Sequence, residues 1–274
     1  MFRPEAHRVS KMRTGFELLE VIYHATVRQL RGTHSNAVVA IVMSVVQAFV
    51  ALAIFVVMFD LLGMRRFAIR GDFILYVMSG VFLFLTHVKA IGAVAGADSP
   101  TSSMMMHAPM NPVIAVVSAA LAALYKQTFA AGVIIFCYHA LMRPITIHDP
   151  VGTMGIFLLA WGSGAAIGLI FYAAKPWQPD VVGVLTTIFM RANMIASGKM
   201  FVANQAAASL RNKFDWNPLY HTIDQARGFM FLNYQPRYTS IEYPIYATLI
   251  CLMIGLMGQF FTRKHVSASW GKRR

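Results

Sequence analysis

Residues 37–62 read AVVAIVMSVVQAFVALAIFVVMFDLL, an apolar run whose single charged side chain, Asp60, comes close to its end. An α-helix rises about 1.5 Å per residue, so roughly 20 apolar residues cross the ~30 Å hydrocarbon core of a bilayer. This run is longer than that minimum. The sequence therefore predicts a membrane-spanning helix over residues 37–62.

Five further runs of the same kind follow along the chain, and with the first they set the fold class. They cover residues 73–94, 113–141, 152–174, 181–199 and 243–261. The composition agrees: 57% of the 274 residues are hydrophobic, 13% are charged and the mean hydropathy is +0.57. In an average soluble domain about a quarter of the residues are charged. We predict an all-α polytopic membrane protein with six transmembrane helices.

An even number of spans places both chain ends on one side of the membrane, and both ends are basic. Their cations are Arg3, Arg8, Lys11, Arg13, Arg28, Arg31, Arg263, Lys264, Lys272, Arg273 and Arg274. The positive-inside rule then predicts that both termini are cytoplasmic, although the opposite loops also carry arginine and lysine. We divide the chain into an N-terminal segment (1–36), a transmembrane domain (37–261) and a basic tail (262–274).

The N-terminal segment predicts an amphipathic helix. Thr14 and Glu17 have the T-x-x-E spacing of a capping box. Apolar side chains then recur at three- and four-residue steps, at Phe16, Leu19, Tyr23, Val27 and Leu30. Such a helix suits the cytoplasmic membrane surface, with its apolar stripe among the headgroups. A solvated helix packed on a soluble partner is the alternative that stays open.

A second predicted cytoplasmic feature is the link between the second and third spans, ADSPTSSMMMHAPMNP, residues 97–112. Proline, serine and threonine interrupt regular structure there, and Met104, Met105 and Met106 lie in its middle. Methionine is flexible and polarisable, which suits docking onto a partner surface. An ordinary interfacial loop explains the same composition, so both interpretations stay open.

Cations inside the predicted spans are the strongest indication of function. Lys126 lies near the middle of the third span, Arg191 near the middle of the fifth, and Lys199 at the end of the fifth. An ionised group at bilayer depth costs several kcal/mol, so it normally faces a partner or a watery cavity. Acidic residues occur only near span ends, as with Asp60 and Asp180. A hydrated path for an anionic cargo is one explanation; snorkelling, or hydrogen bonding to main-chain carbonyls, is the other.

The sequence carries no enzyme signature. GSGAAIG at 162–168 lacks the lysine of a phosphate-binding loop and lies within a predicted span. The nine histidines show no metal-ligand spacing. We therefore predict no catalytic site, no metal and no cofactor held by this chain. The net charge of +13 fits anionic lipid and an acidic cargo better than nucleic acid. Cys137 and Cys251 fall in apolar runs, so we expect buried packing residues and no disulfide.

Residues 216–228, WNPLYHTIDQARG, predict a short helix before the last span. Asn217 is a favoured N-cap and Pro218 a favoured first helical residue. The polar residues His221, Asp224 and Arg227 follow at three-residue steps, and with no nucleophile beside them they indicate ion pairs and hydrogen bonds. The stretch 196–215 is too short and polar to cross alone. We predict an outer re-entrant helical hairpin between spans five and six.

Three segments together resemble the permease subunit of ABC-2-type transporters, in particular the exporters of capsular polysaccharide and O-antigen. They are ASGKMF (196–201), NPLYHTIDQARG (217–228) and YPIYATLICLMIGLMGQFFTRKH (243–265). They are similar to that family's SG turn, its NP-x-x-x-x-x-(D/E)-x-x-R helix and its final span with a basic tail. The resemblance runs over nearly the whole chain. Residues 202–215 depart from it, because they lack the expected proline-bearing stretch.

The resemblance implies a bacterial inner-membrane protein that works as a homodimer with two separate ATP-binding cassette subunits, which would bind the ATP and Mg²⁺. Periplasmic or outer-membrane export components are further implied partners. Residues 97–112 and the N-terminal helix would contact the ATPase, with Met104, Met105, Met106, Glu20 and Arg28 as coupling residues. Asn217, Pro218, His221, Asp224 and Arg227 would form an outer gate helix.

The expected function is export of a polysaccharide, acidic and lipid-linked, along a path lined by Lys126, Arg191 and Lys199. Aromatic rings stack on the apolar faces of sugars, so the in-span aromatics Tyr125, Trp161 and Tyr172 are further path candidates. Core packing or lipid contact is the other explanation for these rings. Two alternative functions stay open: an ABC-2 permease for a lipid or drug, and a membrane assembly protein without transport.

Overall fold

The computed structural model of the protein describes residues 11–31, 36–61, 63, 69, 71–97 and 111–265, and within them every regular element is an α-helix. The helices are α1 (Lys11–Arg31), α2 (Ala37–Leu61), α3 (Phe73–Ala95), α5 (Pro112–Leu141), α6 (Pro150–Ala174), α7 (Pro179–Ala196), α8 (Ala208–Phe214), α9 (Pro218–Met230) and α10 (Glu242–His265). The all-α prediction is confirmed for this part of the chain.

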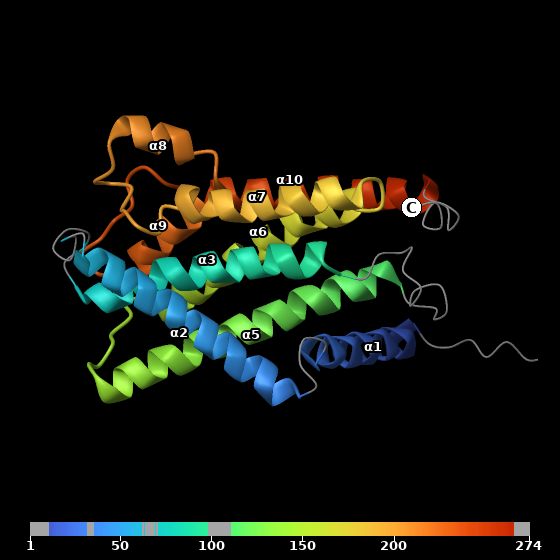
Figure 1. Ribbon diagram of the computed structural model, residues 1–274, viewed down its shortest axis with the longest axis horizontal. Helices are drawn as coiled ribbons and strands as arrows, with labels where there is room; N and C mark the ends of the chain where they lie inside the picture. Colours follow the sequence, from blue (N-terminus) through green and yellow to red (C-terminus); the bar gives the residue numbers. More distant parts are fainter. Residues whose placement is uncertain are drawn as a thin grey trace, which may run out of the picture.

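The helices α2, α3, α5, α6, α7 and α10 run along the bundle and alternate in direction (Figure 1). At one end of the bundle lie α1 and the last turns of α10; we call it the α1 end. At the other lie α8 and α9; we call it the α9 end. Both ends of the described chain therefore lie at the α1 end.

Five of the described helices, α2, α3, α5, α6 and α10, are long and apolar enough to cross a membrane. The chain is thus a polytopic helical membrane protein. The predicted fifth span corresponds to α7, which is not among the five. Its residues Asp180, Arg191 and Asn193 lower the apolar content of an 18-residue helix, so the sixth crossing stays a prediction. That helix also ends at Ala196, before the predicted limit at residue 199.

Polar side chains cap the N-termini of the helices that begin where the chain reverses direction. Asp72 accepts the amide of Ile74 at 2.8 Å, Asn111 that of Val113 at 3.1 Å and Asp149 that of Gly152 at 2.9 Å. The first amides of a helix have no partner within the helix, and hydrocarbon offers none. Asp72 has a second role, because its other oxygen accepts the hydroxyl of Tyr138 at 2.6 Å and ties α3 to the end of α5.

The centre of the bundle is α3, whose most apolar 18-residue stretch is 72% buried, against 17% for that of α2 and 11% for that of α10. Its closest neighbour is α6, at Gly164 and Gly168. A Cβ at Gly164 would overlap the main-chain oxygen of His87, and one at Gly168 would lie 2.8 Å from that of Ile91. Small residues four apart let membrane helices approach this closely.

Two expectations from the sequence are corrected by the structure, and a third concerns residues outside those that the structure describes. Helix α1 begins at Lys11, so Thr14 lies inside it and is not its N-cap. Both cysteines are free as expected, but Cys137 is exposed on α5 and Cys251 is half-buried. The expectation of burial was wrong, because the faces of a membrane helix are apolar whether they meet protein or lipid. Met104, Met105 and Met106 lie outside the described residues.

Replacing Gly164 by alanine should force α3 and α6 apart, because the new methyl group meets main-chain atoms of α3 that cannot rotate away. Overpacking of this kind costs about 1–3 kcal/mol, so we expect a lower Tm for the purified protein in detergent. Gly162→Ala is the matched control, since a Cβ there meets nothing within 4 Å. An unchanged Tm for Gly164→Ala would contradict the close α3–α6 packing.

Candidate functional site

Helix α9 is buried on nearly all sides by α3, α6 and α10. An amphipathic helix at a surface would expose its polar face, but here Asp224 is 2% exposed and Arg227 is fully buried. Short α8 differs, because none of its residues is buried. The two helices of the predicted hairpin therefore exist, and only α9 is enclosed by protein; its depth in a membrane stays a prediction.

Arg227 holds the turn that follows α7. Its Nη1 donates to the carbonyls of Gly198 at 3.2 Å and Phe201 at 2.6 Å, and its Nη2 donates to that of Lys199 at 2.7 Å. The guanidinium also lies 4.3 Å from the centre of the Tyr76 ring in α3. Charge-assisted bonds from this planar fork satisfy three carbonyls that no helix satisfies. The turn needs a glycine, since Gly198 has φ +68°.

Asp224 joins the segment between α7 and α8 to the loop between α9 and α10. It accepts the amide of Ala203 at 3.2 Å, the hydroxyl of Tyr234 at 2.6 Å and the hydroxyl of Thr239 at 2.9 Å. Burial, and then the Asp224 charge, raise the pKa of Tyr234 well above its ordinary value. Tyr234 therefore remains a hydrogen-bond donor at any physiological pH. Three donors thus satisfy a side chain that is buried away from water.

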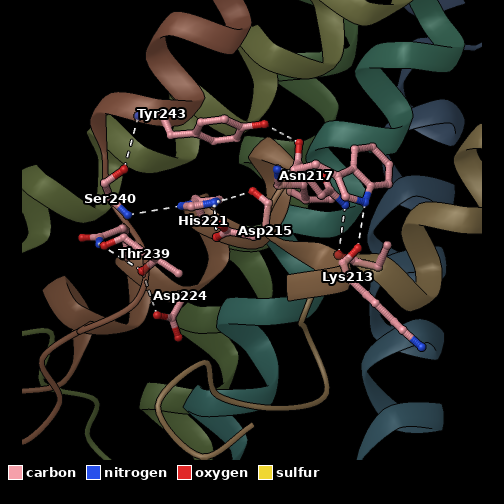
Figure 2. Close-up of polar contacts among 12 residues, drawn as sticks. Lys213, Asp215, Asn217, His221, Asp224, Thr239, Ser240 and Tyr243 are labelled. Carbon is pink, nitrogen blue, oxygen red and sulfur yellow. Dashed lines mark hydrogen bonds and ion pairs between the residues drawn. The ribbon is translucent and has the colours of Figure 1, made fainter. Parts of the chain in front are cut away.

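His221 and Asn217 complete the network around α9 (Figure 2). Nδ1 of His221 accepts the amide of Ser240 at 3.2 Å, so the neutral ring carries its proton on Nε2, which lies 2.8 Å from the Asp215 carbonyl oxygen. The amide of Asn217 donates to Asn193 Oδ1 at 2.8 Å and to the carbonyl at the end of α7 at 3.0 Å. Its own oxygen caps α9 at Leu219.

The predicted gate residues therefore occupy one buried network whose members already have partners. His221, Asp224 and Arg227 make hydrogen bonds to surrounding chain, as the sequence indicated; Asn217 and Pro218 start the helix as expected. The network positions the loops at the α9 end. A gating role for it stays a prediction.

The candidate site for cargo is a cleft of about 600 Å³ in the half of the bundle nearer the α1 end. Its walls come from α1, α2, α3, α5 and one residue of α7. The lining residues are Gln29, Ala40, Met43, Ser44, Gln47, Val88, Lys89, Gly92, Ala93, Gly96, Ala119, Ala122, Ala123, Lys126, Gln127 and Met190. We call this the cationic cleft.

Its charge is of one sign. Lys89 and Lys126 line the cationic cleft, and no acidic residue does. Nζ of Lys89 donates to Oε1 of Gln47 at 3.0 Å, a neutral partner. Ser44 and Gln127 add further hydrogen-bonding groups. In a low-dielectric bundle two uncompensated cations strongly favour an anion between them.

Small side chains make room in the same cleft. Alanine and glycine supply seven of its lining positions, at Ala40, Gly92, Ala93, Gly96, Ala119, Ala122 and Ala123. Sequence reasoning identified Lys126 and missed Lys89. The signal for Lys89 was the same one, a lysine inside a predicted span, but its nearness to the span end made it look ordinary.

The other predicted path residues lie elsewhere. Trp161 donates its Nε1 to the carbonyl of Ala120 at 2.8 Å, and Tyr172 is 1% exposed in the packing between helices. Tyr125 is exposed and stacks on Phe129, with ring centres 6.4 Å apart. Arg191 is exposed on α7. In this single chain the structure thus brings only Lys126 of the predicted set to the cleft.

Metal chemistry has no candidate in the described part of the chain, where no group of three or more histidine, cysteine, aspartate or glutamate residues could hold an ion. Of the titratable side chains of α9, His221, Asp224 and Arg227 have protein partners, while the buried hydroxyl of Tyr220 has none among the described residues. What the arrangement offers chemically is binding of an anion by Lys89 and Lys126.

The chain resembles a known protein over most of its length. No protein-family model matches the chain. The chain is similar to the polysialic acid transport protein KpsM of Escherichia coli, with 23% identity over 252 residues, which are 89% of this chain and 94% of that protein. The similarity therefore extends over most of both chains.

Arg227→Lys should destabilise the α9 network, because an ammonium cannot bond three carbonyls in one plane as the guanidinium does. Breaking a buried charged network typically costs about 3–5 kcal/mol, and we expect a clear fall in Tm in detergent. Arg211→Lys is the control, since Arg211 lies over the exposed Tyr238 ring and should cost little. Equal Tm values for the two variants would show that Arg227 does not hold the network.

Proposed function

We propose that the chain is the permease subunit of an ATP-driven exporter of the ABC-2 type, which moves an acidic, lipid-linked polysaccharide across a bacterial inner membrane. The observation that carries the proposal is the cationic cleft inside a membrane-spanning bundle. The similar Escherichia coli protein is named for the transport of polysialic acid, an acidic polymer. The cleft and that relative indicate the same class of cargo.

The cleft suits a polymer with carboxylate or phosphate groups. Lys89 and Lys126 supply positive charge, and the glutamine and serine side chains supply hydrogen bonds for hydroxyl groups. The alanine and glycine walls leave space that larger side chains would fill. Hydroxyl-rich cargo needs such polar partners, because an unpaired polar group in an apolar site costs free energy.

Energy has to come from another subunit, because the sequence has no phosphate-binding loop. We place two ATP-binding cassette subunits at the α1 end, which we take as cytoplasmic from the basic residues Arg263 and Lys264 there. Glu20 and Arg28, both exposed on α1, and the methionines of residues 104–106 are our candidates for contact with them.

A second copy of the chain would complete the path. Arg191 is exposed on α7 among the exposed apolar residues Ile188 and Ile195. A lone arginine facing lipid is costly, whereas a homodimer with α7 near its centre would give it water or cargo as neighbours. In this proposal ATP binding closes the cassettes, and α1 transmits the motion to the halves of the dimer.

Deletion of the gene tests the function first. Polymer should accumulate inside the cell and disappear from the surface, measured by extraction and staining of both fractions. Re-expression of the chain should restore surface polymer. An unchanged surface glycan after deletion would refute polysaccharide export and favour a lipid or drug as cargo.

Lys126→Met tests the cleft, because methionine keeps most of the side-chain volume and removes the charge. We expect export to fall by about tenfold, the size of effect that a focused charge has on binding an anion. Lys213→Met removes an equal charge from exposed α8 and should export normally. Equal export by both variants would exclude Lys126 from the path.

Arg191→Glu tests the contribution of α7. Reversal of this charge should repel an acidic cargo and abolish surface polymer, while the protein stays inserted and still co-purifies with its ATPase. Surface polymer at the wild-type amount would remove Arg191 from the path.

A further inference from the structure

Lys199 is the least satisfied cation of the described bundle. It is 3% exposed, and its ammonium has no hydrogen-bond partner among the described residues. Instead Nζ lies 3.5 Å from the centre of the Phe84 ring in α3 and 4.5 Å from that of Phe55 in α2. The faces of two aromatic rings hold it by cation–π attraction.

A hydrogen bond holds the main chain of Lys199, whereas its side-chain ammonium has no hydrogen bond among the described residues. Arg227 bonds its carbonyl at 2.7 Å, and Gly80 of α3 lies so close that a Cβ there would be 2.9 Å from the same oxygen. The flexible four-carbon stem then reaches between α2 and α3. Only the two rings hold its tip, so the tip is free to move if those helices separate.

The two rings lie just beyond the cationic cleft. Phe84 precedes the cleft residue Val88 by one helical turn on α3, and Phe55 follows the cleft residue Gln47 by two turns on α2. Residues four apart share one face of a helix. Lys199 therefore lies between the same two helices as the cleft, on the side towards the α9 end.

A purely structural role leaves the charge unexplained. Methionine or leucine would fill the space between two phenyl rings without the cost of removing an ammonium from water. The anion-binding cleft next to it, with Lys89 and Lys126 and no acidic residue, gives the charge a use.

We propose that Lys199 closes the α9 side of the cationic cleft as a retractable plug and is the next anion-binding group on the path. In the resting chain its ammonium is held between Phe55 and Phe84. When α2 and α3 separate, it leaves the rings and binds a carboxylate or phosphate of the advancing cargo. The part of this inference that concerns binding of the cargo rests on the proposed function. The part that concerns closure of the cleft does not.

Closure of the cationic cleft by Lys199 is tested without any polysaccharide. The purified full-length chain is placed in vesicles of phosphatidylethanolamine and phosphatidylglycerol, and chloride efflux is measured. Phe84→Ala should raise the efflux by about tenfold or more, because one wall of the plug is removed and cationic pores speed anion entry by such factors. Phe136→Ala, on the exposed face of α5, is the matched control. Efflux from Phe84→Ala at the wild-type rate would overturn the plug.

Binding of the cargo by Lys199 is tested in cells with the variants Lys199→Met and Lys199→Arg. The methionine variant should export about tenfold less polymer, and the arginine variant should retain export because it keeps the charge and the cation–π contact. Tm values in detergent show whether either variant is misfolded. Wild-type export by a well-folded Lys199→Met would overturn the anion-binding role.

Failure of this inference is distinguishable from failure of the proposed function. If gene deletion leaves surface glycan unchanged, polysaccharide export is refuted, and the chloride measurement still decides whether Lys199 and Phe84 close the cleft. If deletion abolishes surface glycan while Lys199→Met exports normally, the export function stands and the anion-binding role of Lys199 does not.

Discussion

The bonds from Arg227 to the main-chain carbonyls of Gly198, Lys199 and Phe201 are the interaction on which the α9 end of the molecule depends. The chain leaves α7 through a non-helical turn at Gly198 and then runs beside α3. Carbonyls in such a turn have no helical partner, and neither lipid nor packed protein supplies water to them. The guanidinium supplies five donors in one plane. Placing the guanidinium there requires α9 to lie within the bundle. The position of α9 in turn fixes the loops around it.

Charge satisfaction divides the buried and partly buried ions of this bundle into two groups. Asp224 and Arg227 are buried with several close partners each, so their charges are balanced by local dipoles and their role is to hold chain segments together. Lys126 lines an acid-free cleft and Lys199 is stacked between rings. An uncompensated buried cation is tolerated when something outside the chain, water or an anion, supplies the missing partner in the working state.

Glycine and alanine serve two purposes along the central helix α3. On the facing side of α6, Gly164 lies so close that a Cβ there would overlap the main-chain oxygen of His87 in α3. At the face towards α2 and α5 similar residues, including Gly92 and Gly96, line open space. The same residue types thus build a rigid pair of helices on one side and a cleft on the other. A rigid α3–α6 pair beside a loosely enclosed α2 is suited to parting when a partner moves α2.

Local sequence determined the class of the protein. Runs of apolar residues longer than a bilayer is thick have few alternatives to membrane helices, which is why five of the six predicted spans and the start of α9 at Asn217 and Pro218 are found in the structure. The same patterning left open what covers the polar side of α9, since an amphipathic period shows that two faces differ and not what covers each. Only the tertiary structure decided that Asp224 and Arg227 are buried, that Lys89 joins Lys126, and that Lys199 lies between Phe55 and Phe84. Those pairings join residues far apart along the chain, and they follow from how helices pack, which no local period encodes.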